Sequence, residues 1–274
     1  MGSRKGVKLR PTIEREKLRD LVLTLRKDAL SYNEIIRRVE AETGAKLRKS
    51  HVSEWLNGKH RPFGYVRNFD PTPIPELAYV IGVELGDASM SVGKKNYNYM
   101  IKLRVIDKEF AEEFSRCLSV ILRRSPPRVK WHEKTRSWHT QLSSLLLTNF
   151  LRQGLKVLVP TISHCDDCKA AFLRGFFDSE AGMTGRVLRV SNGDRDLLVL
   201  VCNLLSSQSV ETTGIHLSKK AGNLVLIKGR FYRQNLDQMY VYVRSRSLNT
   251  FREKVGFTIV RKKAALDAAL RRED

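Results

Sequence analysis

A duplicated pattern of small and acidic residues constrains this chain more than any other feature. Four residues separate Gly82 from Asp87 in the segment VIGVELGDAS, and four separate Gly175 from Glu180 in the segment FLRGFFDSEAG. A small residue precedes each acid, so each predicted helix carries two small residues four positions apart, which allows two helix backbones to approach closely. We therefore expect the two helices to pack about a pseudo-twofold axis, with both acids side by side at their C-terminal ends.

The two acids would lie in an unfavourable place unless a cation joined them. A helix C-terminus carries partial negative charge, and neighbouring carboxylates repel each other. A divalent cation shared by Asp87 and Glu180 would offset this cost, and Mg²⁺ prefers carboxylate and carbonyl oxygens. Because a bound metal activates water and stabilises a leaving oxygen, the pattern indicates phosphodiester hydrolysis. The alternative is two unrelated buried helices that carry acids by chance.

Similar elements follow each acid, after a loop that is shorter in the second copy. In the first copy we expect strands at 100–105, 128–132 and 138–142, with helices at 107–122 and 144–152. In the second copy we expect strands at 186–190, 224–231 and 239–244, with helices at 194–205 and 248–254. The expected order of each half is α-β-β-α-β-β-α, and the ranges above place three of its four strands. This order predicts an α+β fold with two related halves, residues 71–160 and 161–274.

The predicted strands alternate apolar residues with basic or aromatic ones, so one face of each sheet is positively charged. A twisted antiparallel sheet with such a face can follow a DNA groove as a saddle. For any one side chain, an exposed charge on a solvated sheet face is an equally good interpretation. The candidate DNA-binding residues of the sheets are Lys102, Arg104, Arg128, Lys130, Arg186, Lys228, Arg230, Tyr240, Tyr242 and Arg244.

Residues 1–70 predict a small all-α helix-turn-helix domain that precedes these halves. Apolar residues recur at helical spacing from Leu18 and again after Ser31, and a short third helix ends at Asn57 and Gly58. The last helix of such a unit lies in the major groove. The candidate DNA-binding residues here are Arg48, Lys49, Ser50, Ser53, Lys59 and Arg61. A plain packing module is the alternative, and residues 57–75, rich in Pro and Gly, form the expected linker.

Composition narrows the class of partner. The 274 residues include 50 Lys and Arg against 29 Asp and Glu, a net charge of +21, which favours a nucleic-acid partner. No apolar run approaches the roughly 18 residues that span a bilayer, and Met1 to Lys5 lack the apolar stretch of a signal peptide. We expect no membrane partner and a cytoplasmic location with access to the chromosome. Four irregularly spaced cysteines fit a reducing interior.

With its duplicated Gly-x4-acid pattern, the sequence resembles the LAGLIDADG homing endonucleases, specifically the single-chain, two-motif type of archaeal ribosomal RNA introns. The resemblance covers roughly residues 72–265, and the segments LRGFFDSEA and VIGVELGDA correspond to the two motifs. It implies a monomer that cuts both strands of a long asymmetric double-stranded DNA target, such as an intron insertion site, and leaves 3′ extensions. It also implies Mg²⁺ as cofactor, with Mn²⁺ or Ca²⁺ substituting for binding.

The resemblance also implies roles for individual residues. The final motif acids, Asp87 and Glu180, would bind the catalytic metals, together with the carbonyls of Gly86 and Ser179 before them. Basic residues near the scissile phosphates complete the family's site, and the catalytic candidates of this kind are Lys102, Lys108 and Lys228.

Some positions depart from the family pattern. Ala88 and Ala181 replace the usual glycine after each acid, and Asp178 matches the earlier motif acid, which is usually not catalytic. A rival hypothesis keeps the scaffold without catalysis, either as a maturase that binds RNA or as a DNA-binding regulator. Acids at both motif ends favour the nuclease, because a pure binder gains nothing from two carboxylates that face a polyanion.

Overall fold

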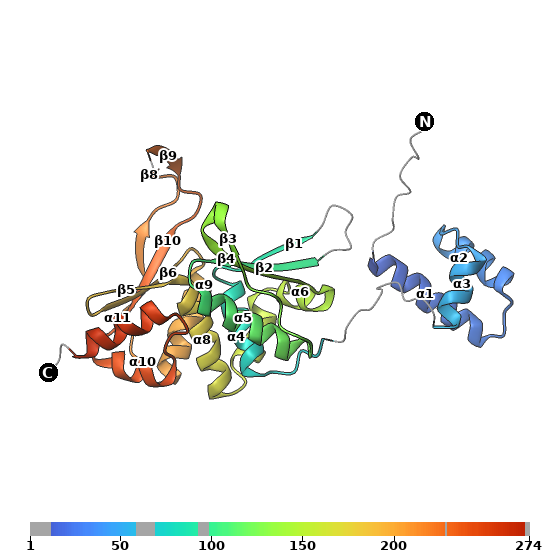
Figure 1. The fold of residues 1–274 in the computed structure, drawn as a ribbon. Coiled ribbons are helices and arrows are strands. Elements are labelled where there is room, and N and C mark those ends of the chain that lie inside the picture. The colour runs from blue at the N-terminus through green and yellow to red at the C-terminus, as the bar shows by residue number, and fades with distance from the viewer. Residues whose placement is uncertain (1–11, 59–68, 93–98, 228, 272–274) are drawn as a thin grey trace. The chain divides into compact units, whose positions relative to one another are not determined.

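The computed structural model describes residues 12–58, 69–92, 99–227 and 229–271 (Figure 1). The chain divides into two compact units, and the first contains residues 1–67 with the short segments 91–100 and 143–145. Two separate hydrophobic cores accompany this division, one within residues 18–56 and one within residues 69–270. In the described ranges, no helix is long and apolar enough to cross a membrane.

Three helices form the N-terminal core, as the sequence predicted: α1 (Thr12–Lys27), α2 (Tyr32–Thr43) and α3 (Lys49–Leu56). A capping box starts α2, because the Ser31 hydroxyl accepts from the backbone of Glu34 and the Glu34 carboxylate accepts from the backbone of Ser31. Gly44 ends α2 in the left-handed conformation, at a φ of 68°. Val52 and Trp55 of α3 are buried in this core.

Two motif helices, α4 (Pro75–Glu84) and α8 (Asp166–Glu180), form the centre of the second unit. Their backbones are so close that a Cβ atom on Gly82 would lie 2.3 Å from the carbonyl oxygen of Phe172. A Cβ on Gly175 would lie 2.5 Å from the carbonyl oxygen of Tyr79. The predicted contact between the two small-residue ridges is therefore confirmed.

Each motif helix is followed by a four-stranded antiparallel sheet, and the two sheets have matching strand orders. The first has the order β1-β2-β4-β3 and contains β1 (Ser89–Val92), β2 (Tyr99–Val105), β3 (Lys130–His132) and β4 (Ser137–Ser143). The second has the order β5-β6-β10-β7 and contains β5 (Ala181–Thr184), β6 (Val187–Asn192), β7 (His216–Lys219) and β10 (Gln238–Val243). This correspondence confirms the duplicated α+β fold.

Helices cover one side of both sheets and leave the other side open (Figure 1). In the first half they are α5 (Lys108–Ile121), α6 (Leu145–Leu151) and α7 (Leu155–Ile162), and a 3-10 turn spans Glu133–Thr135. In the second half they are α9 (Arg195–Ser207), α10 (Leu248–Lys254) and α11 (Val260–Leu270), and a 3-10 turn spans Ser245–Ser247. Alternate strand residues, such as Leu103, Val190 and Val241, are buried beneath this helical layer.

The loops expected after the motif acids contain strands instead. β1 begins two residues after Asp87, and β5 follows Glu180 directly. These strands have four residues each, SMSV and AGMT, and lack the alternation of large apolar side chains that reveals a strand. Pairing with a longer neighbour stabilises them, as where Ala181 of β5 lies opposite Val190 of β6.

The prediction of a single strand at 224–231 is also wrong. This segment divides into β8 (Leu224–Ile227) and β9 (Arg230–Arg233), which form a separate hairpin that projects from the open side (Figure 1). Gly229 between them has a φ of 77°, a left-handed conformation that permits a tight hairpin turn. The short, polar strand β7 pairs with β10 in the position predicted for this segment.

The close contact between α4 and α8 makes a testable prediction. Gly82→Ala should destabilise the protein by about 1–3 kcal/mol, because the new methyl group overlaps a rigid carbonyl of the opposite helix. Gly182→Ala is the matched control, since a Cβ there meets no atom within 4 Å, and we expect a change below about 0.5 kcal/mol. Urea denaturation of both variants measures the difference, and equal stabilities would contradict the close packing.

Candidate metal and nucleic-acid site

The two motif acids lie at the point where the motif helices end. Glu180 is the last residue of α8, and Asp87 follows α4 in a turn in which the amides of Asp87 and Ala88 donate to the Val83 carbonyl. Gly86 brings the two ends into contact, because a Cβ there would lie 2.4 Å from Ser179 Cβ and 3.3 Å from Glu180 Cγ. The fold therefore brings together Gly86, Asp87, Ser179 and Glu180.

The electrostatics of the pair reflect this proximity. Burial raises the pKa of Glu180, and the neighbouring carboxylate of Asp87 raises it further, to about 7. Loss of hydration also raises the pKa of Asp87, although its side chain reaches solvent, and the ammonium of Lys262 lowers it in part. The unfavourable carboxylate pair predicted from the sequence is present, together with a cation that the sequence analysis did not identify.

The oxygen ligands at the two motif ends fit a hard divalent cation whose remaining ligands come from water and a substrate. Within the described ranges, no group of three or more His, Cys, Asp or Glu residues is arranged to hold a metal. Mg²⁺ is commonly bound by one or two carboxylates, and waters and substrate phosphates supply the other ligands. Asp87 and Glu180 supply two carboxylates, and the carbonyls of Gly86 and Ser179 lie on the same turns. These carbonyls remain predicted ligands.

A cavity of about 370 Å³ opens beside Asp87 and Ser179. It is also lined by Arg104 of β2, Thr135 of the 3-10 turn, Ser137 at the start of β4 and Lys262 of α11. Arg104 therefore shares a cavity with a motif acid, although the sequence assigned it only to the DNA-facing strand. Its guanidinium also helps to lower the pKa of His139, after the larger effect of desolvation.

The other catalytic candidates lie elsewhere or cannot be located. Lys102 shares the open face of β2 with Arg104 but does not line the cavity. Lys108 lies in the first turn of α5, where its ammonium is 2.7 Å from the Glu112 carboxylate and 5.5 Å from the Trp138 ring centre. Lys228 lies outside the described residues.

Sequence reasoning missed Lys262, which is only 6% exposed. Its Nζ donates to the carbonyl of Phe177 at 2.9 Å and to that of Asp178 at 2.6 Å. A signal was available, because Ile259, Lys262, Leu266 and Ala269 follow helical spacing and a lysine therefore falls on the apolar side of α11.

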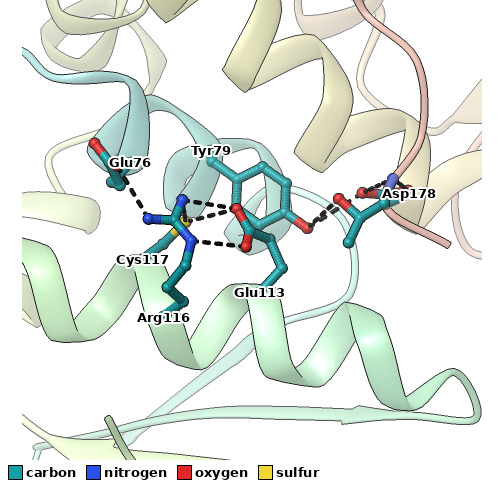
Figure 2. A network of polar contacts seen from close by, with 7 residues as sticks. Glu76, Tyr79, Glu113, Arg116, Cys117 and Asp178 are labelled. Atoms are coloured by element: carbon teal, nitrogen blue, oxygen red, sulfur yellow. Dashed lines mark hydrogen bonds and ion pairs between the residues drawn. The ribbon is translucent and has the colours of Figure 1, made fainter. Parts of the chain in front are cut away.

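Asp178 is a structural acid, and its carboxylate is buried between α8 and the segment before α11. It accepts from the amides of Thr258 at 2.9 Å and Ile259 at 3.3 Å and from the Tyr79 hydroxyl at 3.2 Å. Figure 2 shows Tyr79 directed at Asp178, and also shows a second cluster in which Arg116 lies between Glu76 and Glu113. These contacts account for Asp178 without a metal.

The open face of the first sheet carries the expected basic residues. Lys130 of β3 lies opposite His139 of β4, and the rings of His132 and His139 stack at 4.9 Å. Arg128 is exposed just before β3, and Arg104 is exposed on β2. The histidine stack was not predicted, because it depends on the diagonal pairing of β3 with β4.

On the second sheet, the open face combines aromatic and basic side chains. Arg189 of β6, which was not among the candidates, has its guanidinium carbon 4.1 Å from the centre of the Tyr240 ring. The ring centres of Tyr240 and Tyr242 are 5.0 Å apart. Arg186 precedes β6, and Arg244 is exposed directly after β10. Arg230 belongs to the β8–β9 hairpin, so it does not lie on the predicted four-stranded surface.

The N-terminal candidates gather at α3. Arg48, Lys49 and Ser50 are exposed at its start, whereas Ser53 is half-buried and its hydroxyl accepts from the Asn57 amide at 3.2 Å. Lys59 and Arg61 lie outside the described residues.

Comparison with known proteins supports the family assigned from the motifs. The LAGLIDADG-like domain family matches residues 167–256. The uncharacterised protein MJ0398 of Methanocaldococcus jannaschii is 35% identical over 256 residues, which are 92% of this chain and 93% of that protein. The uncharacterised protein MJ0314 of the same organism is 26% identical over 198 residues, 64% of this chain and 68% of that protein.

The fold also occurs in solved structures of the homing endonuclease I-DmoI. In complex with DNA and Ca, I-DmoI has a TM-score of 0.51 at 17% identity, with 70% of this chain and 97% of that chain covered. In complex with DNA and Mn, the TM-score is 0.50 at 17% identity, with 66% and 96% covered. A duplicated fold with one acid at each motif end defines the class of two-motif LAGLIDADG proteins. This chain belongs to the LAGLIDADG family.

The raised pKa of Glu180 predicts how stability depends on pH in the metal-free protein. Above pH 7 ionised Glu180 is destabilising, whereas near pH 4.5 the carboxyl binds a proton in the folded state and the cost disappears. We expect Glu180→Gln to be more stable than the wild type at pH 8 by on the order of 1–2 kcal/mol, after allowance for solvent screening, and to lose this advantage as the pH falls.

Thermal denaturation in EDTA between pH 4.5 and pH 8 tests this prediction. The matched control is Glu133→Gln, which removes an exposed carboxylate from the 3-10 turn and should not give the same dependence on pH. A stability difference that does not change with pH would show that Glu180 is not held in this environment.

Proposed function

We propose that the protein is a site-specific homing endonuclease, a divalent-metal-dependent phosphodiester hydrolase. It makes a double-strand cut with 3′ overhangs in a long asymmetric DNA target, an intron insertion site. The observation that carries this proposal is the contact between the two motif ends, each of which retains an acid. Such a pair is destabilising by itself, and a divalent cation held between the two carboxylates would offset their repulsion.

Four residues would hold the metal, Asp87 and Glu180 through carboxylates and Gly86 and Ser179 through carbonyls. Mg²⁺ is the proposed ion, and it would activate a water nucleophile and stabilise the leaving oxygen. Structures of I-DmoI with DNA and Mn or Ca support the use of divalent cations in this fold. Arg104, which lines the same cavity as Asp87, would bind and orient the phosphate nearest the first motif.

The open sheet faces would bind the DNA. Their basic residues can pair with phosphates, and the aromatic and histidine side chains can contact base edges or sugars. Because both motifs are in one chain, the protein would act as a monomer, and the unequal acids and sheet surfaces suit a target without twofold symmetry. Residues 1–70 would add a helix-turn-helix contact at one end of the target, with α3 in the major groove.

Removal of either motif acid should separate cleavage from binding. Asp87→Asn and Glu180→Gln should each lower the cleavage rate at least about 100-fold, because each loses a metal-binding charge, while DNA affinity stays equal or rises. The experiment incubates the wild type and the double variant with a long randomised DNA library and Mg²⁺ and sequences the new ends. Glu133→Gln serves as the control for loss of one exposed carboxylate outside the motifs.

The outcomes distinguish the proposed function from its rival. Staggered cuts at one long asymmetric sequence, absent from the double variant and in EDTA, would support the endonuclease and identify its target. Wild-type cutting by either single variant would contradict the site. Salt-sensitive binding without cuts would favour the non-catalytic binder, and assays of intron RNA folding would then test a maturase.

A second prediction concerns α3. Arg48→Ala combined with Lys49→Ala should weaken DNA binding and shrink the DNase footprint at one end of the target. Because two phosphate contacts are lost, the slope of the logarithm of the DNA-binding constant against the logarithm of the salt concentration should become shallower by about two. Arg37→Ala with Arg38→Ala removes the same charge from the exposed face of α2 and should leave the footprint unchanged. Identical footprints for both variants would make the helical unit a packing module.

A further inference from the structure

We propose that Lys262 is the resident counter-ion of the motif acids and a positioning residue that holds the catalytic end of α8. This inference rests on the proposed function for its catalytic meaning, although its electrostatic part can be tested without cleavage. Five observations support it: two hydrogen bonds, the carboxylates that act on the ammonium, a shared cavity, the anchors of α11 and an asymmetry between the motifs.

The two hydrogen bonds of Lys262 lie within the last turn of α8. Carbonyls at the end of a helix lack amide partners from a following turn, although here Ala181 donates to Phe177. The Lys262 ammonium adds donors to Phe177 and Asp178, at 2.9 and 2.6 Å, directly before Ser179 and Glu180. It thereby restrains the backbone from which both predicted ligands of the second motif project.

Two neutral carbonyls do not explain why a lysine that is 6% exposed is tolerated here. A buried ammonium is costly unless negative charge compensates it. Carboxylates of three segments act electrostatically on Lys262: Asp178 of α8 acts most strongly, then Asp87 after α4 and Asp107 before α5. Lys262 also acts on Glu180 of α8, the nearby Arg261 opposes it, and the Phe257 ring centre lies 5.7 Å from its Nζ.

The cavity beside Asp87 contains the same groups. Asp87, Asp178, Ser179 and Lys262 all line it, so the ammonium and the first motif acid face one space. Burial lowers the pKa of Lys262 to about 8, which still leaves much of it charged at neutral pH. The lysine can thus offset the repulsion of the acids before any metal binds.

Further contacts hold α11 in position so that Lys262 reaches this space. Arg261 forms a bidentate ion pair with Asp107, in which both N–O distances are 2.8 Å. The Val260 amide donates to the Glu109 carboxylate at 2.8 Å. The corresponding residue of the second half, Asp194, caps its own helix α9 instead. The first half therefore uses its equivalent acid to anchor α11, which belongs to the second half.

This arrangement is specific to the second motif. Asp178 anchors α8 to the amides of Thr258 and Ile259, whereas Leu85 occupies the equivalent position after α4. Loss of Lys262 should therefore affect Asp87 through charge alone, and Glu180 through both charge and position.

A double-mutant cycle tests the counter-ion role in metal-free protein. Lys262→Met should raise the unfolding equilibrium constant of the wild type at pH 7. In the Asp87→Asn, Glu180→Gln background, the same change should raise this constant several-fold less, because the two motif carboxylates no longer need a cation, although Asp178 and the two carbonyl contacts remain. Lys263→Met, at the exposed neighbouring position, should cause little change in either background. Equal effects of Lys262→Met in both backgrounds would overturn the inference.

A second measurement applies if Lys262→Met does not fold by itself. The triple variant Asp87→Asn, Glu180→Gln, Lys262→Met should then recover a cooperative unfolding transition, whereas a triple variant that also fails to fold would overturn the inference. Calcium titrated into the folded proteins gives a further readout. Because Ca²⁺ replaces the counter-ion, it should raise the melting temperature of Lys262→Met more than that of Lys263→Met, and equal shifts would contradict the proposal.

Failure of this inference and failure of the proposed function give different results. If the double-mutant cycle shows coupling between Lys262 and the acids but the protein never cuts DNA, the counter-ion role is supported and the proposed endonuclease function is contradicted. Cutting without coupling would support the endonuclease and overturn the counter-ion. If both hold, Lys262→Met should lower the cleavage rate at saturating DNA at least tenfold while the DNA dissociation constant changes less than threefold.

Discussion

Backbone contact between α4 and α8 is the constraint on which the second unit depends. Gly82 and Gly175 leave no room for a side chain between the helices, so each helix packs directly on the peptide groups of the other. Gly86 continues this contact beyond the end of α4 and brings Asp87 to Glu180. The sheets follow immediately after these residues, so the same contact also sets where the two halves begin.

Close packing of the helices places two carboxylates next to each other, and basic residues of the same chain compensate their charge. Two carboxylates meet at helix ends that already carry partial negative charge, and the pKa of Glu180 rises to about 7. Lys262 supplies positive charge from α11, and Arg104 lines the same cavity. The site therefore combines acids that can hold a cation with fixed cations that can face a phosphate. Its charge arises from four separate segments of the chain.

Much of the candidate site was predictable because its signals are local. The Gly-x4-acid spacing identified the motif helices and both acids, and strand alternation identified the open faces that carry Arg104, Lys130 and Tyr240. Strands of four residues escaped prediction, since β1, β5 and β7 are too short to show a period. The pattern at 224–231 predicts one strand, whereas the structure has two strands there, with the left-handed Gly229 between them.

The sequence by itself determined the duplicated architecture, the three N-terminal helices and the two acids, because these follow from spacing and side-chain type within short segments. Only the tertiary structure decided which cations accompany the acids. Lys262 lies 82 residues after Glu180 along the chain. A charge acts through space over a few ångströms, so its partner is set by packing between distant segments, which local sequence patterns do not contain.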